Sequence, residues 1–486
     1  MTHASSLQRP CGFSVQPSVA SNSSASTSGP SSSSKTSLVV VSLPIDSTVA
    51  TLPGAAVIGG RSPSGVTTAT FRQRRYGAAV NEPNGARSET RVVAFLAFIG
   101  ILMAFGIDAA LPAYDEVRAD FDLDARNLSP AIIGTVYFVG MAVGQLFFGV
   151  LADRFGRRPI LLLGISVYAL GALGSAVATD LEVLLLARLV WGLGAAAPTV
   201  IRFAIARDLF QGDAMARVVT VVTAVFLLGP ILAPVAGEGI LLVGSWRMVF
   251  VASLGLAAVA LVWTIRFGET LAAEHRRDLR LRPLAQTFVA VARTRVTLWA
   301  IIAQTFFTAA FLVWLGSAQP ILDTVYGRDR QFTLFFGLSG AGMALALMSN
   351  KRLIERFGTA PMALRAALAF VVVGVLGLAA ALAADGVPSV WVWFGWAVVA
   401  NSLTTIMTPM SAALALEPMA DKAGTASAIL GLAQLGAGAL LAAVVDAQID
   451  ATVTPMIAGS LTFACCGTLS LFVATRPAAG AAPAGA

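Results

Sequence analysis

The chain has 486 residues, of which 57% are hydrophobic and only 12% are charged, with a formal net charge of +7. A soluble domain carries about twice that fraction of charged residues, so the composition excludes an ordinary soluble protein and indicates a helical membrane protein. The apolar runs are continuous rather than alternating, which argues against a transmembrane β-barrel. The three cysteines show neither a disulfide framework nor the spacing of metal ligands.

Residues 1–88 differ sharply from the rest of the chain. They are rich in Ser, Thr, Gly and Pro and have too little apolar surface to bury a core. This composition is compatible with a disordered tail or with a transit-type targeting peptide. We favour a third interpretation, an extension upstream of the natural start, with translation beginning near Val80, because the change in composition is so abrupt. A short Ala/Gly/Pro tail occupies 477–486.

From Arg91 onward, apolar runs long enough to cross a bilayer follow one another. We expect twelve spans, at 91–112, 130–152, 159–178, 183–206, 216–241, 247–266, 297–320, 331–350, 361–383, 390–414, 424–445 and 453–475. The sequence therefore predicts an all-α integral membrane protein.

The charged residues between these spans are sorted by sign. Acids are concentrated in the loops after spans 1, 3, 9 and 11, namely Asp115, Glu116, Asp120, Asp122, Asp124, Asp180, Asp385, Asp446 and Asp450. Cations are concentrated on the opposite side, namely Arg72, Arg74, Arg75, Arg87, Arg154, Arg157, Arg158, Arg276, Arg277, Arg280, Arg282, Arg293, Arg295, Lys351, Arg352 and Arg356. Because loops with an excess of Lys and Arg stay in the cytoplasm, we expect both termini to be cytoplasmic and the protein to lie in the cell membrane.

The longest loop between spans, 269–295, is basic and lies in the middle of the chain. It separates a predicted N-terminal six-helix bundle, 89–268, from a predicted C-terminal six-helix bundle, 296–476. The bundles echo each other, since "LADRFGRRP" at 151–159 matches "LIERFGTAP" at 353–361. Parallel repeats of this kind are typical of alternating-access transporters. We therefore expect two bundles related by a pseudo-twofold axis, with a substrate site between them near the midplane.

A tight charged turn, "GVLADRFGRRP", joins spans 2 and 3. Gly149 would let span 2 approach another helix closely, and Gly156 would permit a sharp turn. Asp153 could face the N-terminal end of span 11, at 423–431, and so act as a latch between the two bundles in one conformation. Three further residues could pair with acids or lipid phosphates: Arg154, Arg157 and Arg158. The alternative is a basic loop that only sets orientation.

Three charged residues lie within predicted spans: Asp108, Arg188 and Arg202. A charge inside the membrane is costly and is functional by default. Asp108 and Arg188 lie at similar depth, so we expect an ion pair or hydrogen bond that breaks when Asp108 takes up a proton. The alternative makes Asp108 a satisfied structural residue or one in the outer interface. Arg202 either contacts an anionic group of the substrate or extends with Arg207 to the cytoplasm.

The charged turn resembles the signature loop of the major facilitator superfamily, and the layout of spans agrees with that family over about 90–475. "LLLARLVWGLGAAAPTVIRFAIARDLF" at 184–210 resembles the span-4 motif of the family, with Arg188 as its arginine. "GIDAALPAYDEV" at 106–117 is similar to span 1 of twelve-helix drug:proton antiporters. "IRFAIARDLF", "LGPILAPVAG" and "AGTASAILGLAQ" resemble the branch associated with bicyclomycin and chloramphenicol resistance.

Span 5 contains "GPILAPVAGEG" at 229–239. Pro230 and Pro234 each remove a backbone donor and bend the helix, while Gly229 and Gly237 share a face for close packing. The resemblance identifies this stretch as the antiporter signature, which implies a bent, tightly packed helix that limits leak. Glu238 departs from the family, which commonly has glycine there, and either faces the outer water or is a second titrating acid.

The C-terminal half offers a weaker set of substrate-cavity candidates: Gln304, Phe307, Trp314, Asn401 and Thr405. An apolar cavity with few polar groups suits varied lipophilic ligands. The alternative is that these aromatic residues face lipid or neighbouring helices.

Together these features predict a secondary active exporter that exchanges protons for drug-like small molecules, working as a monomer in the lipid bilayer. The sequence has no P-loop, so we expect no ATP drive and no organic cofactor; we also expect no metal site and no nucleic-acid partner. A proton-coupled transporter of one specific metabolite is the alternative within transport. A channel and an integral membrane enzyme remain further alternatives, and the lack of a catalytic serine–histidine pair or metal cluster in the spans disfavours the enzyme.

Overall fold

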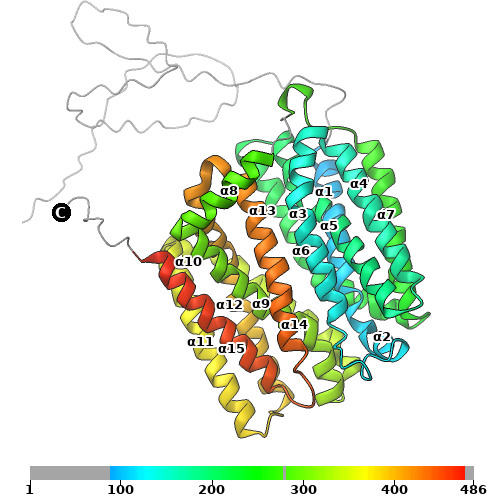
Figure 1. The fold of residues 1–486 in the computed structure, drawn as a ribbon, viewed down its shortest axis with the longest axis vertical. Coiled ribbons are helices and arrows are strands. Elements are labelled where there is room, and N and C mark those ends of the chain that lie inside the picture. Colours follow the sequence, from blue (N-terminus) through cyan, green and yellow to red (C-terminus); the bar gives the residue numbers. More distant parts are fainter. Residues whose placement is uncertain (1–87, 277–280, 477–486) are drawn as a thin grey trace, which may run out of the picture. The chain divides into compact units, whose positions relative to one another are not determined.

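The computed structural model describes residues 88–276 and 281–476 (Figure 1). The expectations for the N-terminal segment up to residue 87 and for the tail at 477–486 lie outside the described residues. Within the described residues every regular element is a helix.

The first half contains seven α-helices and a short 3₁₀ turn, Leu111–Ala113. The helices are α1 (Glu89–Asp108), α2 (Tyr114–Asp120), α3 (Ile132–Phe155), α4 (Arg157–Ala176), α5 (Leu181–Leu209), α6 (Gly212–Leu241) and α7 (Trp246–Phe267). Next comes the connection to the second half, which contains a 3₁₀ turn (Ala273–His275) and α8 (Leu281–Arg293).

The second half begins with α9 (Arg295–Pro320), which continues into a π-helical turn (Ile321–Val325) and is followed by a 3₁₀ turn (Asp329–Gln331). The next helices are α10 (Phe332–Phe357), α11 (Thr359–Ala383) and α12 (Val390–Leu416). A 3₁₀ turn (Glu417–Lys422) follows α12. The last span but one is built from α13 (Ala423–Gly431), a π-helical segment (Leu432–Ala437) and α14 (Gly438–Asp446), and α15 (Thr454–Thr475) ends the described part.

Twelve helices of the described chain are long and apolar enough to cross a membrane, so the twelve predicted spans are confirmed, with ends that move by a few residues. Two local features differ from the sequence-based expectation. The acidic loop after span 1 contains a helix, α2, because Tyr114 and Val117 have apolar neighbours that bury them. The basic linker also contains a helix, α8, which is amphipathic and too short to span a bilayer.

Helices of the first half pack closely on α5, which contacts α3 and α4 along much of its length. A Cβ added at Gly140 of α3 would lie 2.1 Å from the backbone oxygen of Leu189, and one at Gly194 of α5 would lie 2.2 Å from the backbone nitrogen of Tyr168. These contacts are possible only for glycine, as in other close helix pairs in membranes. In the second half, α9 packs on α12 and α15, and α11 packs on the same two helices. The halves meet where α6 contacts α10. They also meet where α3 contacts α13 and α14, and α3 and α13 lie side by side in Figure 1.

The repeated sequence motif forms the same turn in both halves. Gly156 joins α3 to α4 with φ +105° and ψ +159°, and Gly358 joins α10 to α11 with φ +77° and ψ +158°. A positive φ of this size is rarely adopted by residues with a side chain. The internal repeat predicted from sequence is therefore present in the backbone.

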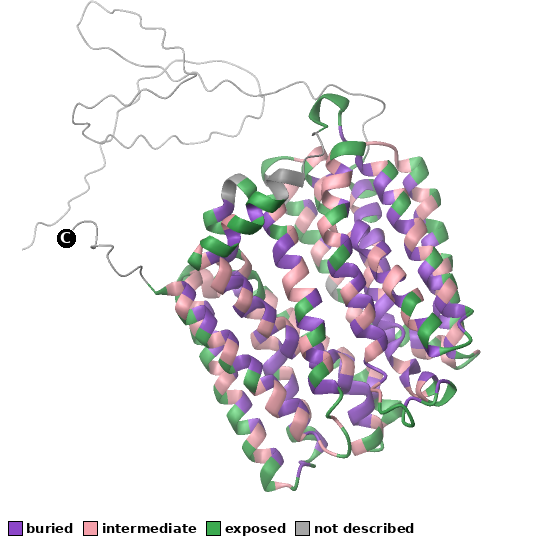
Figure 2. Ribbon diagram, viewed as in Figure 1, coloured by how far each residue is buried: buried purple, intermediate pink, exposed green. Residues whose placement is uncertain are grey.

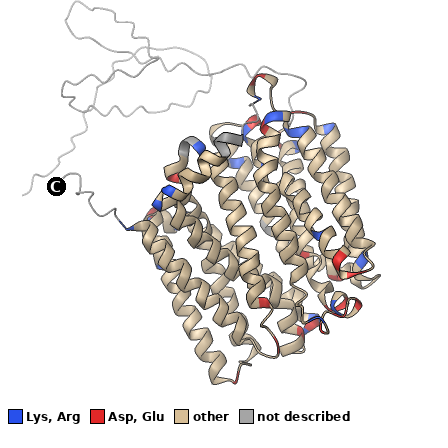
Figure 3. Cartoon of the chain, in the orientation of Figure 1, with Lys and Arg blue, Asp and Glu red and all other residues tan. Residues whose placement is uncertain are grey.

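Exposed residues alternate with buried ones along the outer helices (Figure 2), and many of the exposed residues are large and apolar. Leu170, Leu186, Leu376 and Val444 are each more than half exposed, which suits contact with lipid tails rather than water. Charged residues gather at the two ends of the helices (Figure 3). We call the end with the turns after α3, α7 and α10 the basic end, and the end with the turns after α1, α4 and α11 the acidic end.

Candidate functional site

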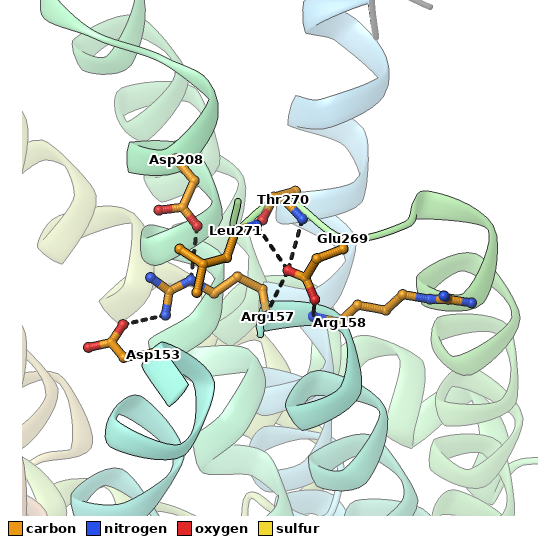
Figure 4. Close-up of polar contacts among 7 residues, drawn as sticks. All are labelled: Asp153, Arg157, Arg158, Asp208, Glu269, Thr270 and Leu271. Carbon is orange, nitrogen blue, oxygen red and sulfur yellow. Dashed lines mark hydrogen bonds and ion pairs between the residues drawn. The ribbon is translucent and has the colours of Figure 1, made fainter. Parts of the chain in front are cut away.

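At the basic end, the predicted signature turn is held by an acid that sequence reasoning missed, Glu269 (Figure 4). Its carboxylate accepts hydrogen bonds from the backbone N–H groups of Arg157, at 2.9 Å, and Arg158, at 3.2 Å. It therefore satisfies two donors at the N-terminal end of α4, where a negative charge is also favoured by the helix dipole. A Cβ at Gly156 would lie 2.4 Å from Oε2 of Glu269, so the turn needs glycine for space as well as for its φ.

Arg157 is the buried centre of this turn, only 4% exposed. Its Nε donates to Asp208 of α5 at 2.9 Å, and its Nη1 donates to Asp153 of α3 at 2.5 Å (Figure 4). The guanidinium thus ties together the ends of three helices of the first half. Paired geometry of this kind is what allows a charge to be buried.

In the described conformation the Asp153 carboxylate binds Arg157 of its own half, because Arg157 lies one helical turn away and reaches it directly. The expected contact of Asp153 with the N-terminal end of α13 in another conformation remains a prediction. Gly149 faces α5 as expected, since a Cβ there would lie 3.4 Å from Val200, but α3 comes closer to α5 at Gly144, where a Cβ would lie 2.6 Å from Ala196. Arg154 and Arg158 lie in the same turn, and their proposed roles remain predictions.

The sequence contained signals for the missed partners. Asp208 belongs to the quoted "IARDLF" stretch, and Glu269 directly follows Gly268, whose φ of +83° ends α7. Neither acid lies near the signature turn in sequence, so only the fold brings them to Arg157.

Arg188 of α5 is completely buried in an aromatic cage. Its guanidinium carbon lies 4.9 Å from the ring centre of Tyr137, 4.8 Å from that of Trp191 and 5.5 Å from that of Phe250. Cation–π contacts of this kind are stronger where water is excluded.

The hydrogen bonds of Arg188 correct the predicted pair with Asp108. Nη1 donates to the backbone oxygen of Gly106 at 2.9 Å, and Nε donates to that of Ile133 at 3.3 Å. Among the described residues, Nη2 has no partner. Arg188 therefore reaches the C-terminal part of α1, but its Nε and Nη1 donate to backbone carbonyl groups and not to the Asp108 carboxylate.

Asp108 is the last residue of α1 and is 5% exposed. No hydrogen bond or ion pair to its carboxylate is formed by the described residues. A buried carboxylate without donors is costly as an anion and can be carried as a neutral acid. The structure thus brings Asp108 and Arg188 to the same region while leaving the carboxylate unpaired.

Arg202, about a quarter of the way along α5 from the basic end, is a second buried arginine. Its guanidinium carbon lies over the rings of Phe203 and Phe226, at 4.7 and 4.6 Å, and its Nε and Nη1 have no partner among the described residues. Gly100 of α1 leaves room for it, since a Cβ there would lie 2.5 Å from Nη1. Contact with a substrate anion remains a prediction for Arg202.

The expected close packing of α6 is present against α1. A Cβ at Gly237 would lie 2.1 Å from the backbone oxygen of Ala109, and one at Gly229 would lie 2.5 Å from the Cβ of Ala104. Both Pro230 and Pro234 lie inside the continuous helix. Glu238, on the same helix, is only partly buried, and its possible titration remains a prediction.

The substrate-cavity candidates of the second half separate into two groups. Gln304 and Asn401 are buried polar residues: Gln304 donates to Gln434 at 3.3 Å, while the Asn401 side-chain nitrogen has no partner among the described residues. Thr405 is partly buried and donates to the backbone oxygen of Asn401.

The two aromatic candidates pack inside the second half in this conformation. Phe307 is fully buried, with its ring against Phe370 and against Gly467, where a Cβ would lie 2.5 Å from it. Trp314 stacks on Phe336 with ring centres 4.9 Å apart. Both side chains therefore serve helix packing here, which was the alternative interpretation.

A cavity between the halves lies toward the acidic end. The first half lines it with Ile107, Leu111, Tyr114, Ala131, Gly134, Thr135 and Phe138, and the second half with Leu312, Leu315, Gly316, Ala439, Ala442 and Asp446. The residues predicted to contact substrate do not line this cavity. Next to it, the halves are joined by a hydrogen bond in which the side chain of Gln319 in α9 donates to Asp115 in α2.

Asp446 corrects an expectation, because the sequence placed it among the acids of the loops and the structure places it inside a helix. It is the last residue of α14 and is 3% exposed, and Ser317 of α9 donates a hydrogen bond to it. The sequence contained one indication that Asp446 is buried, namely its position directly at the end of an apolar run. Across the described residues, no group of His, Cys, Asp and Glu is arranged to hold a metal ion.

A family model described as Major Facilitator Superfamily matches residues 96–443. The chain is 31% identical over 378 residues to a bicyclomycin resistance protein homolog of Haemophilus influenzae, covering 77% of this chain and 93% of that protein. It is 28% identical over 415 residues to the uncharacterized MFS-type transporter YdgK of Bacillus subtilis, covering 82% of this chain and 99% of that protein. It is 29% identical over 354 residues to the multidrug resistance protein MdtL of Shewanella oneidensis, covering 71% of this chain and 86% of that protein.

Solved structures share the fold at lower sequence identity. A D-xylose–proton symporter superposes with a TM-score of 0.65 at 16% identity, covering 80% of this chain and 97% of that chain. The human organic anion transporter MFSD10 superposes with a TM-score of 0.58 at 21% identity, covering 80% and 100%. These likenesses confirm the predicted architecture of two six-helix bundles.

Proposed function

The chain belongs to the major facilitator superfamily, and we propose that it exports drug-like small molecules from the cell in exchange for protons. The names of two relatives, a bicyclomycin resistance protein homolog and a multidrug resistance protein, support the substrate class. The unpaired, buried carboxylate of Asp108 supports the use of protons, and this observation carries the proposal.

Asp108 is suited to exchange because it can be neutralised in only two ways while it stays buried. It can bind a proton, or it can meet a donor or cation on a ligand, and a single carboxylate does not need both at once. Competition between the two then couples export of a molecule to entry of a proton. Arg188, held on the carbonyl of Gly106, keeps α1 in place beside the carboxylate.

The two ends of the helices supply the contacts that alternating access needs. At the acidic end, the bond between Gln319 and Asp115 joins the halves in this conformation. At the basic end, Arg157 holds Asp153 within the first half. We propose that Asp153 exchanges this contact for the N-terminal end of α13 when the basic end closes.

The distribution of charge supports an orientation with the basic end, and with it both termini, in the cytoplasm. We propose a multi-pass protein of the cell membrane that works as a monomer, with lipid, protons and small lipophilic molecules as its partners. Transport driven by the proton gradient needs neither an organic cofactor nor catalysis.

Proton release on ligand binding tests the proposal. Purified protein in weakly buffered detergent is mixed with a panel of lipophilic cations, neutral antibiotics and polar metabolites, and the pH change is compared between wild type and Asp108→Asn. Asp122→Asn is the matched control, since Asp122 is an exposed acid of the same end with φ +48°, a conformation that asparagine accepts.

We expect release by wild type and by Asp122→Asn, and none by Asp108→Asn. Binding without release, or equal release by all three proteins, would show that Asp108 is not the coupling acid. Release with a single polar metabolite alone would replace drug export by specific metabolite transport.

A further inference from the structure

A second buried carboxylate lies where the two halves meet at the acidic end. Asp446 ends α14, and its Oδ1 accepts a hydrogen bond of 2.5 Å from the hydroxyl of Ser317. Its Oδ2 faces Gly316, where a Cβ would lie 3.0 Å away. The same Cβ would lie 2.8 Å from the Cβ of Ala131, at the start of α3 in the other half. Asp446 is therefore enclosed by residues of both halves.

The surroundings of Asp446 supply no cation. The elements that pack on α14 are α3, α9, α15 and the π-helical segment before it. Charged residues in these elements lie at their opposite ends: Asp153, Arg154 and Arg295. Tyr114 is the one other titratable residue among those that line the cavity, and the nearest acid in sequence beyond Asp446, Asp450, is exposed.

The helix ends do not decide the charge of this group. Asp446 belongs to the C-terminal end of α14, which disfavours an anion, and it lies beside the N-terminal turn of α3, which favours one. These two effects are of comparable size and opposite sign. Burial without a cation is the larger effect, and it favours the neutral acid as long as the halves stay together.

We propose that Asp446 is a second proton-binding site, and that uptake of a proton from the water at the acidic end allows this end to close. With the halves apart, the carboxylate meets water and can be an anion. Before closure it binds one proton, and the neutral acid is then buried against Ala131 and Gly316. The bond between Gln319 and Asp115 forms beside it and holds the closed end.

This inference rests on the proposed proton coupling, but its test needs neither a drug nor a proton gradient. Cysteines replace Thr179, in the turn between α4 and α5, and Val387, in the turn between α11 and α12; both positions are exposed and lie at the acidic end of different halves. Cys11, Cys465 and Cys466 are changed to alanine. The distance between spin labels at the two positions is measured by double electron–electron resonance in lipid nanodiscs, as the pH is lowered.

In wild type we expect the population with short distances to grow as the pH falls. Asp446→Asn, which is always neutral, should show the short distance at every pH. Asp450→Asn is the matched control and should titrate like wild type. Ser317→Ala removes a donor to the charged carboxylate, so its midpoint should move to higher pH by about one unit.

The proposal is overturned if Asp446→Asn follows the wild-type titration, or if Ser317→Ala leaves the midpoint unchanged. Ser317→Ala keeps the carboxylate and so answers the question even if Asp446→Asn does not fold. A pH response that is lost in Asp108→Asn and kept in Asp446→Asn would assign closure to Asp108 alone. If wild type shows the expected pH-dependent distances but releases no proton on drug binding, the role of Asp446 in closure stands and the proposed exchange of drug for proton is wrong.

Discussion

The buried arginine of the signature turn allows a prediction about which of its two ion pairs matters. Arg157 is 4% exposed, and the side chains of its partners differ: Asp208 is 12% exposed and Asp153 is 36% exposed. An ion pair with one partner in water contributes about 0–1 kcal/mol. Breaking a buried pair costs about 3–5 kcal/mol, because the remaining charge is left without a partner. The structure therefore assigns most of the stabilisation to Arg157 and Asp208, although the bond to Asp153 is the shorter one.

A double-mutant cycle measures this difference. The cycle uses three single variants, Arg157→Met, Asp208→Asn and Asp153→Asn, and two double variants that combine Arg157→Met with each acid substitution. Each protein is heated in detergent, and size-exclusion chromatography gives the midpoint temperature at which monodisperse protein is lost. We expect Arg157→Met to lower the midpoint by about 5 °C or more, given about 2–4 °C per kcal/mol in chains of a few hundred residues. Asp208→Asn should recover part of that loss in the double variant, because no buried anion is then left unpaired.

The coupling between Arg157 and Asp153 should be smaller, about 1 kcal/mol or less. If the coupling energy between Arg157 and Asp153 equals or exceeds that between Arg157 and Asp208, the more buried pair is not the more stabilising one and the reasoning is refuted. Such a coupling would also show that the short contact to Asp153 is kept in solution and must be broken before Asp153 can contact the second half.

Two glycine comparisons test packing and turn geometry. Gly237→Ala should sharply reduce the yield of folded protein, because its Cβ would lie 2.1 Å from the backbone oxygen of Ala109. Gly239→Ala on the same helix is the control and should be neutral, since its Cβ would meet nothing within 4 Å. Equal yields of monodisperse protein from the two variants would contradict the packing of α1 on α6. Gly156→Ala should lower the midpoint temperature of unfolding more than Gly358→Ala. Both positions have a positive φ, but only at Gly156 would the added Cβ lie 2.4 Å from Glu269. A larger loss of stability in Gly358→Ala would mean that Glu269 does not hold the turn.

The spans could be predicted because a helix in lipid must satisfy its own backbone hydrogen bonds. Its presence therefore depends on a local run of apolar residues and little on its neighbours. The turn at Gly156 was predictable for a similar reason, since a glycine between two apolar runs marks a local change of direction. The helix α8 was missed because an amphipathic helix in a charged linker lacks the hydropathy of a span.

Partners at helix ends could not be predicted in this way. Arg188 was expected to meet Asp108, but at the same depth it finds the carbonyl groups of Gly106 and Ile133, which no hydropathy pattern marks as acceptors. Glu269 and Asp208 come to Arg157 from distant parts of the chain. Each of these contacts depends on which helices lie side by side.

The sequence by itself determined the membrane environment, the twelve spans, the internal repeat and the family, because each follows from local composition or from a short motif. The tertiary structure alone decided which charges are buried and with what. Asp446 and Asp450 are four residues apart at the end of the same span, yet one is enclosed by α3 and α9 and the other faces solvent. Burial is a property of the neighbours that a residue acquires on folding, so the sequence could name the acids but not separate the enclosed one from the exposed one.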